Sequence, residues 1–180
     1  AAMPDLKLSI SHTTRPIRQS EKDGIDYYFV QEKNFKKLLD GRVFLEYAKV
    51  YDYYYGTSKV WVEDELNKGS DIILEIDWQG ARQIKAMFNQ DAVFIYLLPP
   101  SLDALKQRLH GRAEDNLEVI NARLAKAKQD ISHYEEFDYL VVNDDLDKAV
   151  SELTTIIKSM KLGVKQQKNN LKKLLRQLLD

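Results

Sequence analysis

From about residue 58 onward, short apolar runs alternate with segments of helical periodicity. The apolar runs predict strands at residues 71–76, 92–97 and 139–142. Helices are predicted at 58–68 (ended by Gly69), 79–87, 101–110, 116–131 and from 144 or 145 to 160. Strands that are apolar throughout and separated by helices indicate a parallel sheet covered on both faces.

The first third of the chain has a different pattern. Its apolar runs are short and aromatic, with Gly or Pro turns between them, and only residues 34–40 have a helical pattern. This pattern predicts a small antiparallel or mixed β subdomain attached to the parallel sheet. Its strands are expected at 6–10, 27–30, 43–50 and 53–55.

Composition narrows the class of protein. A chain of 180 residues, 44% hydrophobic and 31% charged, suits one globular domain. The absence of cysteine excludes disulfides, thiolate metal sites and cysteine nucleophiles. A net charge of −1 argues against a protein that coats nucleic acid through overall positive charge, and no apolar run is long enough to span a bilayer. With no signal-peptide pattern at its start, the chain suits a cytoplasmic α/β enzyme or binding module.

The C-terminal segment is strongly basic. Residues 161–180 hold six cations and one acid, a net charge of +5, which leaves −6 for the rest. Leucines at 171, 174, 175, 178 and 179 have helical spacing. Such a helix suits a membrane or nucleic-acid surface, but packing on the acidic body or on another subunit is the more ordinary interpretation.

Two loop arginines are candidate phosphate ligands. Arg15 and Arg18 follow Ser11 and two threonines, and paired arginines can hold one phosphate by charge-assisted hydrogen bonds. Tyrosines at 27 and 53–55 could complete such a clamp. Taken singly, loop arginines are more often solvated surface, and a tyrosine cluster in a small sheet is more often core packing.

Acidic residues occur in two strand contexts. Glu46 lies in an otherwise apolar strand. The ordinary interpretation is that its side chain faces solvent, and the functional interpretation is that it recognises guanine. Guanine offers two adjacent donors to a carboxylate, whereas adenine offers an acceptor there. Glu75 and Asp77 end the strand at 71–76, at the carboxyl edge where ligands bind in open α/β folds. Capping the next helix is nearly as good an interpretation of Asp77.

Further arginines flank a polar segment between two predicted helices. Arg108, Arg112 and Arg123 border the sequence around 111–116. A flap there could neutralise charge on a transferring phosphoryl group, although helix arginines beside acids are usually surface ion pairs.

Together these residues resemble guanylate kinase over essentially the whole chain. The matching motifs are S-x-S-H-T-T-R-P-x-R at 9–18, D-G-x-x-Y at 23–27, F-L-E at 44–46, Y-Y-G-T-S at 54–58, L-E-I-D-W-Q-G at 74–80, L-P-P-S at 98–101 and V-N-D-D at 142–145. The resemblance is to the bacterial form, and it implies Mg²⁺-dependent transfer of the ATP γ-phosphoryl group to GMP or dGMP.

The resemblance also assigns residue roles. It implies that the GMP phosphate is held by Ser11, Arg15, Arg18, Tyr27 and Tyr55. Guanine would be read by Glu46, Thr57 and Glu75, with Glu21 and Gly56 nearby and Asp77 at the phosphate–metal edge. Arg108, Arg112 and Arg123 would grip ATP and the moving phosphoryl group, Asn143 would lie near adenine, and no residue is assigned as a metal ligand.

The implied fold is that of a P-loop NTPase: an α/β three-layer αβα architecture with a parallel core sheet, a small mixed β GMP-binding subdomain and a helical lid. On this division, residues 1–8 are the end of the core N-terminal helix and a connection, and 9–57 are the GMP-binding subdomain. The core is 58–110 and 125–160, the lid is 111–124, and 161–180 are a basic amphipathic helix through which the chain could form a homo-oligomer.

One family motif is missing from the sequence. None of the seven glycines belongs to a Gly-x-x-x-x-Gly-Lys-Ser/Thr phosphate loop. We therefore expect that a strand–loop–helix unit of about 20–30 residues precedes the sequence. We also expect that the 180 residues alone are inactive and poorly folded, with a gap in the core sheet.

Two other functions remain as alternatives. A non-catalytic guanylate-kinase-like module that binds phosphopeptides would suit a chain without a phosphate loop, but it would not need the lid arginines, Asn143, Glu75 or Asp77. A nucleic-acid-binding role of the 161–180 helix would require binding with a steep salt dependence.

Overall fold

A computed structural model describes residues 3, 6–88, 91–112 and 117–180, with side chains for all of these except 110–122 and 169. The chain divides into two compact units, unit 1 at residues 1–93 and unit 2 at 94–180, which are taken one at a time below. This division differs from the single domain expected from chain length. It falls between two strands that the sequence analysis placed in one sheet.

Unit 1 contains a pair of parallel strands. Strand β1 (Leu6–Leu8) pairs with β6 (Asp71–Ile73), with Leu6 opposite Asp71 and Leu8 opposite Ile73. The expectation that residues 1–8 are a helix end and a connection, and that 6–10 belong to the mixed subdomain, is therefore wrong for 6–8. Parallel strands need a long crossover, and residues 9–70 supply it.

The crossover contains the predicted mixed sheet. Its strand order is β3 (Tyr28–Phe29), β2 (His12–Thr13), β5 (Tyr53–Ser58) and β4 (Phe44–Val50). Strand β5 is antiparallel to both its neighbours, whereas β2 and β3 are parallel. Helix α1 (Glu32–Asp40) buries Phe35 completely, with its ring stacked on Phe44 at 4.5 Å. Of these strands only β2 was missed, because His12 and Thr13 lie in a polar segment without an apolar run.

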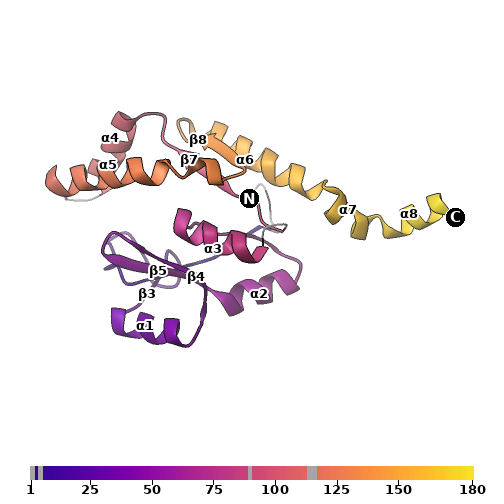
Figure 1. Cartoon of the computed structure of the whole chain (residues 1–180), viewed down its shortest axis with the longest axis horizontal. Coiled ribbons are helices and arrows are strands. Elements are labelled where there is room, and N and C mark those ends of the chain that lie inside the picture. The colour runs from indigo at the N-terminus through magenta and orange to yellow at the C-terminus, as the bar shows by residue number, and fades with distance from the viewer. Residues whose placement is uncertain (1–2, 4–5, 89–90, 113–116) are drawn as a thin grey trace. The chain divides into compact units, whose positions relative to one another are not determined.

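Two helices flank β6 in sequence. Helix α2 (Lys59–Asn67) is capped by Ser58, the first residue of the helix predicted at 58–68, and α3 (Trp78–Phe88) follows β6. The predicted strand at 71–76 ends at Ile73, so residues 74–77 form an irregular link into α3. Helix α3 lies along β4 (Figure 1).

Unit 2 has its own pair of parallel strands, β7 (Ile95–Leu98) and β8 (Tyr139–Val142). Its helices are α4 (Leu102–Arg112), α5 (Leu117–Ile131), a 3₁₀ turn η1 (Tyr134–Glu136) and α6 (Leu146–Lys161). Ser101 and Asp145 cap α4 and α6, with side-chain oxygens 3.0 and 2.8 Å from the backbone nitrogens of Ala104 and Lys148. These caps confirm the predicted helix starts.

The parallel strands are less covered than predicted. In the described residues they form two separate two-stranded sheets, which agrees with the gap expected in the core sheet. In β8 only Val141 is buried, and Leu140 and Val142 are nearly half exposed. A pair of strands leaves much of its edges and faces open, so the prediction of burial on both faces is wrong here.

The C-terminal segment forms two helices where one was predicted. Helix α7 (Val164–Asn170) follows Gly163, and α8 (Lys172–Leu179) begins after Leu171 (yellow in Figure 1). The five leucines of the predicted stripe are 39–85% exposed. Among the described residues no helix is both long and apolar enough to cross a membrane.

Candidate functional site

Strand β5 carries two halves of a candidate site. Tyr55 and Thr57 are two residues apart on this strand, so their side chains lie on the same face of the sheet. Tyr55 belongs to a group that we call the arginine corner, which consists of Arg15, Glu21, Tyr27 and Tyr55. Thr57 belongs to the buried-acid corner, which consists of Glu46, Thr57, Asp77 and Gly80.

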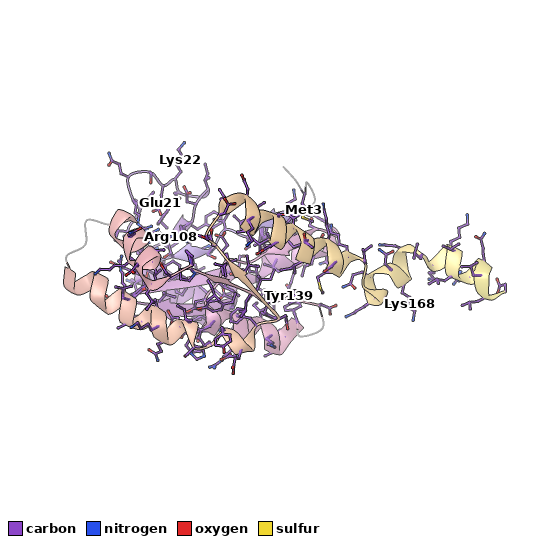
Figure 2. All side chains as sticks on the ribbon, turned by 90° about the horizontal axis from the view of Figure 1, so that it is seen from above. Met3, Glu21, Lys22, Arg108, Tyr139 and Lys168 are labelled. Atoms are coloured by element: carbon purple, nitrogen blue, oxygen red, sulfur yellow. The ribbon has the colours of Figure 1, made fainter. Side chains whose placement is uncertain are left out.

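The arginine corner is organised by Glu21, on the loop between β2 and β3 (Figure 2). Its Oε1 lies 2.7 Å from Nη2 of Arg15, and its Oε2 accepts the Arg18 backbone N–H at 2.8 Å. Arg15 also donates to the Pro16 carbonyl at 2.7 Å, and its side chain is only 11% exposed. The predicted pair of arginines is therefore held on one carboxylate.

Aromatic rings enclose Arg15. Its guanidinium carbon lies 5.4 Å from the Tyr27 ring centre and 5.7 Å from that of Phe29, within cation–π range. The Tyr27 and Tyr55 rings are 6.0 Å apart, edge to face, and the Tyr55 hydroxyl interacts with Arg15. Phe29 was missed by sequence reasoning, because an aromatic residue in a short strand is indistinguishable from core.

Two pKa shifts describe this corner. The hydrogen bond from Arg15 holds the pKa of Glu21 below its usual value, so Glu21 is an anion at neutral pH. Burial raises the pKa of Tyr27, with a further contribution from Tyr55, so its hydroxyl keeps its proton. Guanidinium N–H groups and phenol O–H groups gathered here can donate to an anion such as a phosphate.

The buried-acid corner begins with an irregularity in β4. The register with β5 shifts between Phe44 and Glu46, as a β-bulge does, and the three consecutive residues 44–46 are all buried. Glu46 is 4% exposed. The interpretation of Glu46 as a solvent-facing residue is therefore wrong.

The Glu46 carboxyl has an unusual environment. The Thr57 hydroxyl, itself fully buried, donates to Glu46 Oε1 at 2.5 Å. Burial raises the Glu46 pKa to about 7, and the nearby charge of Asp77 acts in the same direction. A buried carboxyl that titrates near neutral pH is typical of a recognition or catalytic site.

Asp77 and Gly80 complete this corner from the start of α3. Asp77 Oδ1 accepts the Gly80 N–H at 3.0 Å and its Oδ2 accepts from Gln79 Nε2 at 2.8 Å, so the capping interpretation of Asp77 is confirmed. Gly80 is buried against the Glu46 carboxyl. Gly80 was not among the predicted site residues, because its role depends on a contact between distant segments.

The other predicted residues of unit 1 have mixed environments. Ser11 is buried, and Glu75 is exposed but close enough to Tyr27 to affect its pKa. Gly56 is packed against core rings: a Cβ on it would lie 2.9 Å from Phe44 Cδ1 and 3.1 Å from Phe35 Cζ. Its lack of a side chain is thus explained by packing.

In unit 2, two predicted residues are brought together. Arg108 Nη2 donates to the Asn143 backbone carbonyl at 2.8 Å, which joins α4 to the end of β8. Arg123 lies half-buried on α5. Arg112 is the last residue of α4, but its side chain and much of the predicted lid at 111–124 lie outside the described residues.

No group of three or more His, Asp or Glu side chains that could hold a metal ion occurs among the described residues.

Comparison with known proteins gives a consistent result. A sequence model of the family described as "Guanylate kinase" matches residues 3–160. The guanylate kinase of Coxiella burnetii is 46% identical over 179 residues, which is 99% of this chain and 86% of that protein. That of Methylococcus capsulatus is 47% identical, over 99% of this chain and 87% of that protein.

A solved structure is also similar. The crystal structure of guanylate kinase from Anaplasma phagocytophilum superposes with a TM-score of 0.80 at 33% identity, and covers 92% of this chain and 81% of that one. This similarity agrees with the predicted P-loop NTPase-like α/β fold.

Proposed function

The chain belongs to the guanylate kinase family, whose members are ATP:GMP phosphotransferases, and we propose that GMP binds across the two corners of unit 1. The family is one of nucleoside monophosphate kinases, so the reaction is the conversion of ATP and GMP to ADP and GDP. The residue roles below are our assignment.

The observation that carries the assignment is the position of Tyr55 and Thr57 on one face of β5. We assign the GMP phosphate to the arginine corner, where Arg15 lies against the Tyr27 ring and interacts with the Tyr55 hydroxyl. We add Arg18, which is held on Glu21, and Ser11 to this assignment. Glu21 does not suit direct contact with a phosphate, because both are anions. Its role is to orient Arg15 and Arg18.

We assign guanine to the buried-acid corner. An ionised Glu46 can accept the N1–H and the amino N–H of guanine together, whereas adenine presents an acceptor at N1 and is repelled. Thr57 fixes the carboxylate through Oε1, and Asp77 lies near it. Glu75, whose charge acts on Tyr27, is assigned to guanine from the family resemblance. None of these assigned contacts uses the ribose 2′-hydroxyl, so we propose dGMP as a second acceptor.

ATP binding is assigned to unit 2. We propose that Arg108, Arg112 and Arg123 hold the ATP phosphates and that Asn143 lies near adenine. The bond to Asn143 orients the Arg108 guanidinium and uses one of its five N–H donors. Mg²⁺ is expected to arrive with the ATP phosphates, and no step is derived through it.

The chemistry follows from positioning. Transfer of a phosphoryl group needs little covalent help, so alignment of donor and acceptor and neutralisation of charge supply most of the acceleration. Arg15 holds the acceptor phosphate in place, and the arginines of unit 2 neutralise charge as it builds on the group in transfer. Exclusion of water protects ATP from hydrolysis.

The alternative of a phosphopeptide-binding module finds no support. The relatives compared above are all named guanylate kinases.

Two further assignments concern the setting of the enzyme. The exposed leucines of α8 and its basic charge, against a net −6 for residues 1–160, support self-association through this helix. Equilibrium sedimentation of Leu174→Asp against the parent chain tests this, because loss of the apolar stripe should leave monomers.

ATP and GMP belong to the cytoplasmic nucleotide pool, so we place the reaction in the cytoplasm.

The test of the GMP site is calorimetric titration of GMP into Arg15→Ala. Loss of a charge-assisted clamp should weaken binding by about 100-fold. Lys22→Ala is the matched control: Lys22 lies on the same loop (Figure 2), the charge change is equal, and binding should stay within about twofold. Equal affinities for Arg15→Ala and the control would refute the assignment.

A further inference from the structure

Gly80 and the Glu46 carboxyl are packed closely together in the buried-acid corner. A Cβ built on Gly80 would overlap Glu46 Oε2 and would lie 3.1 Å from Glu46 Cδ. The carboxylate therefore occupies the space that any other residue at position 80 would fill with its side chain. This is a property of the pair, because Gly80 comes from α3 and Glu46 from β4.

The approach is fixed by hydrogen bonds on both sides of it. Gln83, one turn along α3, donates from Nε2 to the Tyr47 carbonyl at 2.7 Å and accepts the Tyr47 N–H at 3.2 Å. Asp77 caps the same turn through the Gly80 N–H. The helix is thus attached to the residue next to Glu46, and its first turn has a defined position against the carboxyl.

The other oxygen of Glu46 is also held. Oε1 accepts from the Thr57 hydroxyl, so the carboxyl is confined between β5 and the first turn of α3. A buried side chain that is 4% exposed has few alternative positions. Displacement of Oε2 would therefore change which atoms Glu46 presents to a ligand.

We propose that Gly80 is a positioning residue for guanine selectivity: because it has no side chain, it leaves the space in which the Glu46 carboxylate is held to contact guanine. The proposal deepens the proposed function and rests on the assignment of guanine to Glu46. It concerns a residue that makes no assigned contact with the nucleotide.

The test variant is Gly80→Ala. The new methyl group meets the carboxyl end of the Glu46 side chain, which must shift within its confined site, and the Ile76 Cβ at 3.2 Å, which needs a shift of only a few tenths of an ångström. Alanine is also a better helix former than glycine. The variant should therefore fold and melt near the parent temperature while its carboxylate is displaced.

The measurement is the ratio of the dissociation constants of AMP and GMP, taken by calorimetry on each variant. In Gly80→Ala this ratio should fall by about tenfold, through weaker binding of GMP. Gly41→Ala is the matched control, because a Cβ at Gly41 meets nothing closer than the Lys37 carbonyl at 3.3 Å, and it should leave the ratio unchanged. An unchanged ratio in Gly80→Ala overturns the proposal.

A double-mutant cycle separates positioning from a structural effect. In Glu46→Ala the carboxyl is gone, so adding Gly80→Ala should alter neither the ratio nor the melting temperature of that background. If Gly80→Ala unfolds the chain and also unfolds Glu46→Ala, position 80 is merely structural and the proposal fails. If only the variant with Glu46 present is affected, the conflict is with the carboxyl, as proposed.

The variant Glu46→Gln distinguishes failure of the proposal from failure of the underlying assignment. Its amide can donate to adenine N1, so the AMP to GMP ratio should drop. If Glu46→Gln keeps the parent ratio, the assignment of guanine to Glu46 is wrong. If the AMP to GMP ratio falls in Glu46→Gln but keeps its parent value in Gly80→Ala, only the role assigned to Gly80 is wrong.

Discussion

The two corners of unit 1 each contain a glutamate, and the two carboxyl groups have opposite surroundings. Glu21 accepts hydrogen bonds from Arg15 and from the Arg18 backbone, and its pKa is lowered. Glu46 is shielded from water and accepts a hydrogen bond from the Thr57 hydroxyl, and its pKa is raised to about 7 by burial. The same side chain is thus fixed as an anion at one corner and poised between two states at the other.

The difference indicates two separate tasks. The arginine corner recognises charge, which every nucleoside monophosphate carries, so its residues should affect all such ligands equally. The buried-acid corner recognises a pattern of donors, which only guanine offers, and it needs the ionised carboxylate for that. Each prediction below tests whether affinity and selectivity separate in this way.

The largest expected effect is on stability, through the buried acid. The folded Glu46 carboxyl binds its proton more tightly than the unfolded one, so the associated stability is complete below about pH 4.5 and is lost as pH rises through about 7. Between pH 5 and pH 8 the ligand-free protein should lose about 2–3 kcal/mol of unfolding free energy relative to Glu46→Gln. Urea titrations at several pH values measure this difference.

The control for that experiment is Glu21→Gln. In the parent, Arg15 lowers the pKa of Glu21, so any stability that the Glu21 carboxylate contributes is lost only at acid pH. The plot of unfolding free energy against pH for Glu21→Gln should therefore run parallel to that of the parent between pH 6 and pH 8. Parallel curves for the parent and Glu46→Gln would mean that the Glu46 carboxyl is not desolvated in the folded protein.

Much of the fold was predictable because it depends on local signals. The capping residues Ser58, Ser101 and Asp145 fixed three helix starts to within a residue. The failure concerns non-local pairing, since residues 6–8 pair with a strand more than sixty residues away. The gap in the core sheet was expected from the missing phosphate-loop motif, and the parallel strands of the described residues form two sheets.

The site was predictable as a set of residue types, but not as a geometry. The resemblance identified Arg15, Tyr27 and Glu46, and the structure brings Arg15 and Tyr27 together. The burial of Glu46 follows from a register shift in β4, which no periodicity reveals. Gly80 could not be found either, because the sequence does not show that α3 lies against β4.

The next expected effect is on affinity alone, at the arginine corner. Tyr27→Phe removes one hydroxyl donor, which the raised pKa keeps protonated at neutral pH, and leaves the ring beside Arg15. GMP and AMP should both bind about tenfold more weakly, with their ratio unchanged. Competition titrations of both nucleotides measure it; a change confined to GMP would show that the corners do not act separately.

The smallest expected effect is at the buried-acid corner, in Thr57→Val. The hydrogen bond from Thr57 lowers the Glu46 pKa against the larger opposing effect of burial, so its loss should raise that pKa further. At pH 7 a smaller fraction of Glu46 is then ionised, and GMP should bind about fivefold more weakly. AMP should not weaken, because a protonated carboxyl can donate to adenine N1. Because the deficit comes from protonation, it should shrink as pH rises towards 9. Thr57→Ser, which retains the hydroxyl, should stay near the parent, and a deficit in Thr57→Val that is constant with pH would assign the loss to packing instead.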